Sequence, residues 1–218
     1  MASSVSTLTP GNRQPAHGDD LLLRETNHRC SNDLQMVVSL LALQSRRAET
    51  PEARQALTDV MERVSILARA RSALSQDRQP SIGGALRQVC EALHAQAEPR
   101  SILISMQVEQ EVHGLSPHQI TTLALVVNEL ATNAIKHAFE EGKSGHIRIT
   151  AGGSPGREVT IMVDDDGLPF PEATSRSGDG LGLGLVKRLV ASIGGLFIPP
   201  PPGSIVFEIR VAVQSGGA

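Results

Sequence analysis

The segment LLLRETNHRCSNDLQMVVSLLALQ, residues 21–44, decides the architecture of the N-terminal part of the chain. It contains no Pro or Gly, and Leu34, Val37, Val38 and Leu41 recur at the spacing of one apolar helical stripe. We therefore predict a long amphipathic helix. At about 100° per residue, His28 projects roughly 130° from the centre of this stripe, on a polar flank. A lone histidine in such a place is most often an ordinary surface residue.

A second amphipathic helix is predicted directly after the first. Thr50-Pro51-Glu52 supplies an N-cap, a Pro at the first helical position and an acid in the first turn. A further apolar stripe follows, and it includes Leu57 and Val64. Two long helices joined by a few residues form an antiparallel hairpin. Because each stripe covers the other only in part, we expect two hairpins to pair as a four-helix bundle in a homodimer.

Beyond a break near residues 77–80, helical and strand patterns mix without strict alternation. Ser81 and Ser116 are placed to cap helices, and residues 101–108, 146–151, 158–164, 196–198 and 204–213 have the character of strands. This pattern predicts an α+β layer with a mixed sheet and helices on one face. The expected division of the chain is a disordered lead-in at 1–20, the hairpin at 21–77, the α+β domain at 81–213 and a tail at 214–218.

The composition excludes several classes of protein. A net charge of −3 gives no sign of a nucleic-acid partner, and two cysteines indicate neither a disulfide framework nor a zinc cluster. With four Phe and no Trp or Tyr, a bound nucleotide base is not expected to rest on a broad aromatic platform. No apolar run approaches the roughly 18–20 residues of a membrane span, and no signal-peptide core is present. We expect a cytoplasmic protein.

The first cluster of polar residues in the predicted α+β domain lies on one helix. Glu129 and Asn133 are one turn apart, as are Asn133 and His137, and Lys136 lies beside them. An acid, an amide and a Lys on one helical face can hold a hydrated Mg²⁺ and a phosphate chain. The alternative is a solvated face with ordinary charge pairs.

Two further clusters follow along the chain. Asp165 ends a predicted strand beside Gly167, so its carboxylate can accept a hydrogen bond from an adenine amino group; the alternative is a simple acidic turn. Gly-rich sequence then precedes and enters a helix, where the backbone can approach phosphates at the helix N-terminus. These glycines are Gly178, Gly180, Gly182 and Gly184. Their spacing is that of neither a P-loop nor a dinucleotide-binding loop.

Taken in this order, the three clusters resemble the ATP-binding domain of the GHKL superfamily, which includes histidine kinases and DNA gyrase. NELATNAIKHAF, residues 128–139, resembles the N box, DDDG the G1 box and GLGLGL the G2 box. The resemblance implies an α/β sandwich that binds ATP and Mg²⁺. It implies that Asn133 coordinates Mg²⁺, that Asp165 binds adenine, and that glycines 178–184 form a lid over the phosphates. Pro169 replaces the usual second Gly of the G1 box.

The resemblance extends back to the first helix. ETNHRCSNDLQMVVSLLALQ, residues 25–44, is similar to the phosphoacceptor helix of a histidine-kinase subgroup close to the HWE kinases, although the chain has no Trp. It implies that His28 accepts the γ-phosphoryl group of ATP and passes it to an Asp of a response-regulator receiver domain. Asn32 occupies the position from which related kinases orient water for dephosphorylation of the regulator. Arg29 follows His28 where commoner kinases carry the acidic base, so Glu25, Glu129 or neither serves as base.

Two other functions remain open. A non-catalytic histidine phosphotransfer or scaffold protein would keep the hairpin and the His but lose ATP-site residues. A GHKL Ser kinase of the anti-sigma type would lack the long hairpin with its His. Twenty polar residues before the first helix cannot fold a sensor domain, so we expect the input to come from a separate sensor protein or from a longer kinase.

Overall fold

The computed structural model describes residues 16–76, 81–110, 112, 114–154, 158–169, 181–201 and 203–213. The helical hairpin is α1 (Ala16–Arg47) and α2 (Pro51–Gln76). The second part runs through α3 (Ile82–Ala97), the 3-10 helix η1 (Glu98–Arg100), β1 (Ile102–Val108), α4 (Pro117–His137), β2 (Gly145–Ser154), β3 (Glu158–Asp165), α5 (Leu181–Ser192), β4 (Leu196–Ile198) and β5 (Phe207–Ala212). A helical hairpin followed by an α/β sandwich confirms the predicted fold class.

Helices α1 and α2 run antiparallel, and side-chain hydrogen bonds record their register. Ser31 Oγ donates to the Ala68 carbonyl at 2.9 Å, and Ser45 Oγ donates to the Arg54 carbonyl at 3.5 Å. Helix α1 begins at Ala16, five residues before the predicted start, so the expected disordered lead-in is wrong for residues 16–20. Residues 1–15 lie outside the described part of the chain.

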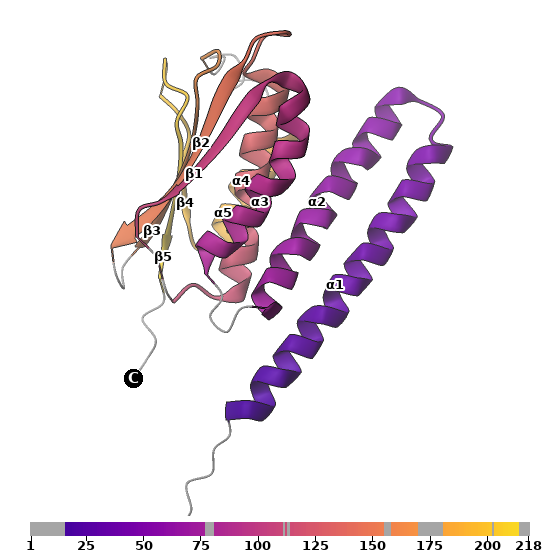
Figure 1. Cartoon of the computed structure of the whole chain (residues 1–218), viewed down its shortest axis with the longest axis vertical. Coiled ribbons are helices and arrows are strands. Elements are labelled where there is room, and N and C mark those ends of the chain that lie inside the picture. The colour runs from indigo at the N-terminus through magenta and orange to yellow at the C-terminus, as the bar shows by residue number, and fades with distance from the viewer. Residues whose placement is uncertain are drawn as a thin grey trace, which may run out of the picture.

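The sheet has the strand order β1-β2-β3-β5-β4, with β1 and β2 parallel and the other neighbours antiparallel. Helices α3, α4 and α5 lie together on one face of it, and the hairpin lies beyond this helical layer (Figure 1). Strand β3 alternates buried and half-buried residues along its whole length, as a strand with one covered face must. The hydrophobic core therefore lies between the sheet and its three helices.

A capping box determines where α4 starts. Ser116 Oγ accepts a hydrogen bond from the Gln119 backbone N–H at 3.2 Å, and Gln119 Oε1 accepts one from the Ser116 N–H at 2.9 Å. Gln119 Nε2 also donates to the carbonyl of Ala212, the last residue of β5, at 3.3 Å. The start of α4 is thus joined to the sheet, and this sets the position of the predicted N box along the helix.

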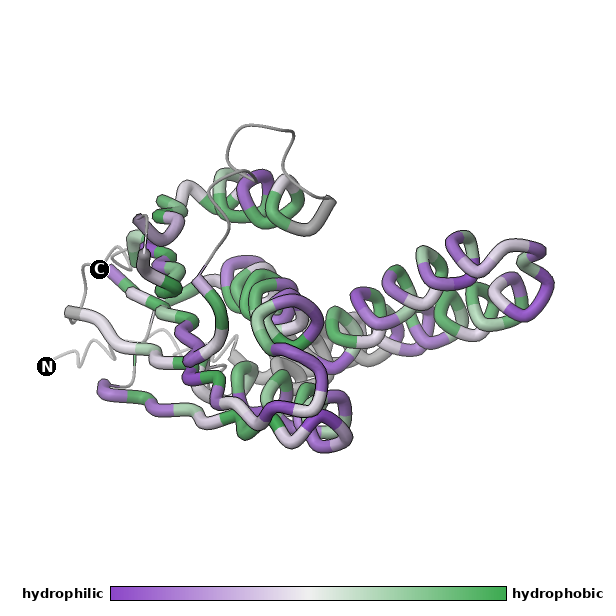
Figure 2. The backbone as a smooth tube through the Cα atoms, turned by 90° about the horizontal axis from the view of Figure 1, so that it is seen from above, coloured by the Kyte–Doolittle hydropathy of each residue, from purple (hydrophilic) through white to green (hydrophobic). Residues whose placement is uncertain are grey.

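The hairpin leaves apolar side chains in solvent. Leu34, Val38 and Leu41 are half-buried, whereas Val37 is exposed in the single chain. The large side chains exposed on the hairpin are Met36, Val37, Leu40 and Leu43 of α1 and Val60 of α2. Hydrophobic segments run along both helices where the hairpin extends away from the sandwich (Figure 2). One chain by itself therefore does not cover this surface.

Candidate active site

The predicted N box begins in the second half of α4, and its acidic residue, Glu129, is shielded from solvent. Asn128 and Glu129 are buried, Asn133 is half-buried, and Lys136 and His137 are exposed at the end of the helix. The alternative of an ordinary solvated face is therefore wrong for Glu129, which is only 5% exposed. A buried carboxylate needs a partner, because removing an unpaired charge from water is costly.

That partner comes from the hairpin. Arg63 of α2 donates from Nε and Nη2 to the two carboxylate oxygens of Glu129, at 2.7 and 2.8 Å. The hydrogen bond to Glu129 raises the pKa of Arg63. Four residues earlier on α2, Asp59 Oδ1 accepts a hydrogen bond from Lys136 Nζ at 2.9 Å. Although partial burial acts in the opposite direction, hydrogen bonds from Lys136 and Gln55 lower the pKa of Asp59. Two residues of the predicted ATP site are thus bound to α2.

Asp165 is the last residue of β3, where it pairs with Ile147 of β2, whereas the pairing of β3 with β5 ends at Val163. The residue is 9% exposed, and its Oδ1 accepts a hydrogen bond from the Gly167 N–H at 3.0 Å. Burial raises the pKa of Asp165, and the neighbouring charges of Asp164 and Asp166 add to this increase against the effect of the Gly167 hydrogen bond. A buried carboxylate that is held by a local hydrogen bond can accept a further hydrogen bond from an amino group of a ligand.

Gly167 brings this turn into contact with the end of α4. A Cβ atom at Gly167 would lie 2.4 Å from the Ala138 carbonyl oxygen, which is closer than any side chain permits. The next N–H, of Leu168, donates to the same oxygen at 2.7 Å. Because Ala138 directly follows α4, the contact places Asp165 at the same end of the domain as Asn133 and Lys136.

The remaining predicted residues are described only in part. Gly182 and Gly184 lie in the first turn of α5, whereas Gly178 and Gly180 lie outside the described residues. His28 lies within α1, but its side chain lies outside the description; Asn32 lies one turn later and is exposed. The structure therefore unites Glu129, Asn133, Lys136, His137, Asp165 and Gly167 at one end of the domain.

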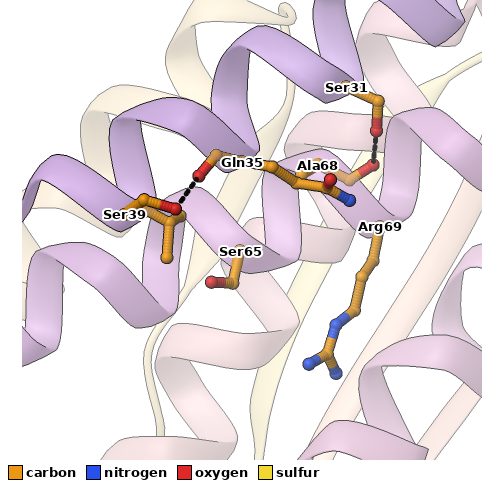
Figure 3. Close-up of a pocket in the computed structure, with 7 residues that line it drawn as sticks. Ser31, Gln35, Ser39, Ser65, Ala68 and Arg69 are labelled. Carbon is orange, nitrogen blue, oxygen red and sulfur yellow. Dashed lines mark hydrogen bonds between the residues drawn. The ribbon is translucent and has the colours of Figure 1, made fainter. Parts of the chain in front are cut away.

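A pocket opens between α1 and α2 close to the turn that contains His28 (Figure 3). The hydrogen bond from Ser31 to Ala68 crosses between the two helices there, and Ser39 Oγ donates to the Gln35 carbonyl at 3.0 Å. Arg69 of α2 is exposed and adds a guanidinium group. The residues that line the pocket are Ser31, Gln35, Val38, Ser39, Ser65, Ala68 and Arg69. This part of the hairpin thus offers hydrogen-bonding groups and a positive charge.

Sequence reasoning missed three residues that belong to the surroundings of the site, namely Asp59, Arg63 and Thr132. Asp59 and Arg63 are ordinary charges in the sequence, and only the packing of α2 on α4 reveals their partners. Within the described residues, Asn128 Oδ1 and Thr132 Oγ1 are buried and lack hydrogen-bond partners. They are one helical turn apart, and unsatisfied buried oxygens of this kind indicate a place for water or ligand. The signal available in the sequence was the position of Thr132 four residues after Asn128 within the N box.

The side chains present are compatible with Mg²⁺. The amide oxygen of Asn133 and the carboxylate of Glu129 are hard oxygen donors, which this ion prefers. Among the described residues no group of three or more His, Cys, Asp and Glu could hold a metal ion. Mg²⁺ needs no such cage, because it keeps several waters and binds substrate phosphates through one or two protein ligands.

We predict that Gly167→Ala weakens ATP binding, because the new Cβ must displace the turn from Ala138 and move Asp165. Overpacking of this kind costs about 1–3 kcal/mol, so calorimetric titration with ATP should show an affinity about tenfold lower or more. Gly152→Ala is the matched control, since its Cβ would meet mainly the flexible side chain of Glu109, at 3.1 Å. Equal affinities for the two variants would contradict the assigned role of the turn.

Two family models match the chain. The model described as "Histidine kinase" matches residues 25–97, and that of the "Histidine kinase-like ATPase domain" matches residues 90–194. Together they span the hairpin and most of the sandwich. In the described part of the chain, no helix combines the length and hydropathy required to cross a bilayer.

The chain is 36% identical to the sensor histidine kinase PdtaS of Mycobacterium tuberculosis over 79% of its own length and 35% of that protein. It is 28% identical to blue-light-activated histidine kinase 2 of Erythrobacter litoralis, over 80% of this chain and 52% of that one. The solved histidine kinase domain of the blue-light-activated kinase EL346 from Erythrobacter litoralis shares the fold, with a TM-score of 0.63 at 24% identity, over 89% of this chain and 92% of that one. The chain spans about a third to a half of the length of the curated relatives. It belongs to the histidine kinase family, with a helical hairpin followed by a histidine kinase-like ATPase domain.

Proposed function

We propose that this protein is an ATP-dependent protein-histidine kinase that phosphorylates itself on His28. The observation that carries the proposal is the contact of the turn after Asp165, at Gly167 and Leu168, with Ala138 at the end of α4. A buried carboxylate suited to adenine lies at the same end of the domain as the oxygen donors suited to Mg²⁺. The family match supports the same reading from both parts of the chain.

Each residue of the ATP site has a separate role in this proposal. Asp165 accepts a hydrogen bond from the adenine amino group, and the Gly167 N–H holds its carboxylate in place. Asn133 binds Mg²⁺, which neutralises charge on the phosphates when it is bound. Lys136 and His137 lie at the end of α4, where they can contact the phosphate chain, and the glycines at 178–184 close over it. Catalysis is then mainly positioning and charge neutralisation.

The transfer step forms a bond between an imidazole nitrogen of His28 and the γ-phosphorus and breaks the bond from that phosphorus to the oxygen of ADP. Neutral imidazole is a competent nucleophile, so orientation matters more than activation. Glu129 can act as base only after it separates from Arg63, because both of its oxygens accept hydrogen bonds from that guanidinium. Glu25, or no protein base, are the other options.

The phosphoryl group then passes to an Asp of a response-regulator receiver domain, which binds the hairpin around His28. The pocket at Ser31 supports this location, since Arg69 can pair with a transferred phosphoryl group. In this proposal Asn32, which is exposed one turn after His28, orients water during dephosphorylation of the regulator. A separate sensor protein, or a further part of a longer kinase, supplies the signal.

In this proposal the protein forms a homodimer, in which a second hairpin packs against the first. Met36, Leu40 and Leu43 lie at the i, i+4 and i+7 spacing of one helical face, and they are 59%, 58% and 46% exposed. An apolar face of this kind on a soluble helix is typical of an interface. Pairing with a second hairpin as a four-helix bundle would cover it.

The division of labour between the two parts of the chain gives the first test of the kinase. His28→Ala should bind ATP normally but yield no phosphoprotein. Asp165→Asn should lose affinity for ATP by roughly 1–3 kcal/mol, because an amide mismatches the adenine amino group. Label from γ-³²P-ATP on the wild type should be lost in acid and kept in base, as a phosphoramidate requires. Acid-stable label on the His28→Ala protein would instead support a Ser kinase.

A charged side chain introduced on the exposed apolar face of α1 tests the proposed dimer. Leu40→Asp should convert a particle of twice 23.1 kDa into a monomer in light scattering, because a buried unpaired carboxylate opposes assembly. Leu103→Asp is the control, since Leu103 is similarly exposed, at 60%, but lies on β1. A wild-type monomer at micromolar concentration, or a Leu40→Asp dimer, would contradict the bundle.

A further inference from the structure

The C-terminal end of α4 depends on hydrogen-bond donors from other parts of the chain. A helix leaves its last carbonyl groups without partners inside the helix. In α4 the Ala134 carbonyl accepts a hydrogen bond from the N–H of Ala138, the residue that follows the helix, at 2.9 Å. The carbonyl groups that come after Ala134 need donors from elsewhere, because a buried carbonyl without a partner is costly.

One such donor is the side chain of Arg100, which lies between α3 and β1. Its Nη1 donates to the Ile135 carbonyl, and its Nη2 donates to the Phe139 carbonyl at 3.1 Å. The guanidinium group thus joins the last turn of α4 to a residue beyond the helix. Its rigid planar fork suits two acceptors at once, unlike the single ammonium group of a lysine. Its positive charge also favours this end of the helix, where the macrodipole is negative.

The backbone around Arg100 determines where this guanidinium group starts. Arg100 ends η1, and Ser101 after it has a φ of 55°, in the left-handed region. Non-glycine residues keep this conformation where the surrounding structure requires it. Here the Ser101 N–H donates to the Glu98 carbonyl at 3.0 Å, and the Ser101 carbonyl accepts a hydrogen bond from the Gly145 N–H at 3.3 Å. The turn therefore joins Arg100 to the start of β2.

Phe139, which carries one of the two acceptors, is held by packing as well. Its side chain belongs to the hydrophobic core, and the residue is 8% exposed. A Cβ atom at Gly145 would overlap the Phe139 ring, so the ring lies directly against the backbone at the start of β2. Ser101 and Phe139 thus both contact Gly145, and Arg100 closes this arrangement by its hydrogen bond to Phe139.

This arrangement encloses part of the proposed ATP site. Residues 136–138 lie between the two carbonyl groups that accept hydrogen bonds from Arg100, and they include two residues of the predicted N box. The Ala138 carbonyl accepts a hydrogen bond from the Leu168 N–H at 2.7 Å, in the turn that follows Asp165. The segment that Arg100 holds is therefore the segment on which this turn rests.

We propose that Arg100 is a positioning residue of the ATP site, which sets the end of α4 against the turn that follows Asp165. The proposal rests on the proposed function, because it assumes that ATP binds to both segments. Arg100 acts through backbone carbonyl groups and does not contact the nucleotide. Without it residues 136–138 shift, and the groups of α4 that bind phosphate and Mg²⁺ lose their position relative to the adenine acceptor. A displacement of about 1 Å is enough to weaken such a site.

A double-mutant cycle on ATP affinity tests this role. Arg100→Gln should lower the affinity for Mg-ATP in calorimetric titration by about tenfold, and Arg100→Lys should retain part of it because it keeps the charge. Arg100 and Gly167 both act on the segment around Ala138, so their effects should not multiply. Arg100→Gln combined with Gly167→Ala should bind ATP about as weakly as the weaker of the two single variants. An affinity that falls by the product of the single effects would overturn the proposal.

Two controls accompany the cycle. Arg87→Gln removes the same charge from an exposed position of α3 and should keep the wild-type affinity. Gly152→Ala should leave the effect of Arg100→Gln unchanged, because the atoms nearest to its Cβ belong to Glu109, which Arg100 does not contact.

Amide hydrogen exchange provides a readout that needs no nucleotide. In Arg100→Gln the Leu168 amide should exchange roughly tenfold faster than in the wild type, because its acceptor at Ala138 is no longer held in place. The amides of Ile161 and Val163 in β3 should change less, which separates a local effect from a general loss of stability. No change at Leu168, or the same acceleration at all three amides, would overturn the proposal.

The two readouts also separate failure of this role from failure of the kinase. If the wild type binds no ATP, the proposed function is wrong, and exchange at Leu168 still decides whether Arg100 holds the end of α4. Circular dichroism identifies a variant that fails to fold. If Arg100→Gln does so, the same comparison made with Arg100→Lys decides the question, because that variant keeps the positive charge at the end of α4.

Discussion

Helix α4 is buried on almost every side, and this constraint determines where the polar groups of the site lie. Fifteen of its residues are buried, and they include Asn128, Glu129 and Thr132. Apolar neighbours such as Leu123 and Val127 fill the core, so each polar group needs a partner from another element. Arg63 supplies one for Glu129, whereas Asn128 and Thr132 have oxygens without one in the described residues. Glu129 thus joins α4 to the hairpin, whereas the unpaired oxygens of Asn128 and Thr132 lie within the predicted N box.

The two ion pairs between α2 and α4 differ in strength for the same reason. Breaking a buried pair by removing one partner typically costs 3–5 kcal/mol, whereas an exposed pair is worth about 0–1 kcal/mol. Glu129 is close to the first case, although the 29% exposure of Arg63 moderates it, and Asp59 with Lys136 is close to the second. The pair of Arg63 with Glu129 therefore contributes most to the docking of the two parts. The pair of Asp59 with Lys136 adds specificity to the alignment of the two helices. If the acidic and basic residues exchanged places along α2, the same register against α4 would bring like charges together.

Local patterns in the sequence predicted the elements well. The caps at Ser81 and Ser116 are both present, with Ser81 Oγ accepting a hydrogen bond from the Gly84 N–H at 3.1 Å. Gly167, two residues after Asp165, permits the close approach of Ala138. Each of these features depends on residues close in sequence or on a requirement of the backbone itself, which is why spacing alone reveals them.

Contacts between segments far apart in the sequence could not be predicted from local spacing. The pairs of Arg63 with Glu129 and of Asp59 with Lys136 join residues 66 and 77 positions apart. The periodicity of a sequence does not show which face of one helix packs against which face of another. The strand order, with its parallel β1–β2 pair, could not be predicted from the sequence either. Val37 fits the apolar stripe by spacing yet is exposed, because the stripe is wider than the surface that one α2 helix covers. The role of His28 remains a prediction from the resemblance of residues 25–44.

The central claim is that the phosphoryl group of ATP is transferred to His28. The direct measurement is mass-spectrometric mapping of the wild-type chain after incubation with Mg-ATP, with digestion and separation kept at neutral or alkaline pH so that a phosphoramidate survives. The account predicts a single added phosphoryl group on the peptide that contains His28, on the imidazole ring. A phosphoryl group on a Ser or Thr, or on another of the seven histidines, would contradict it.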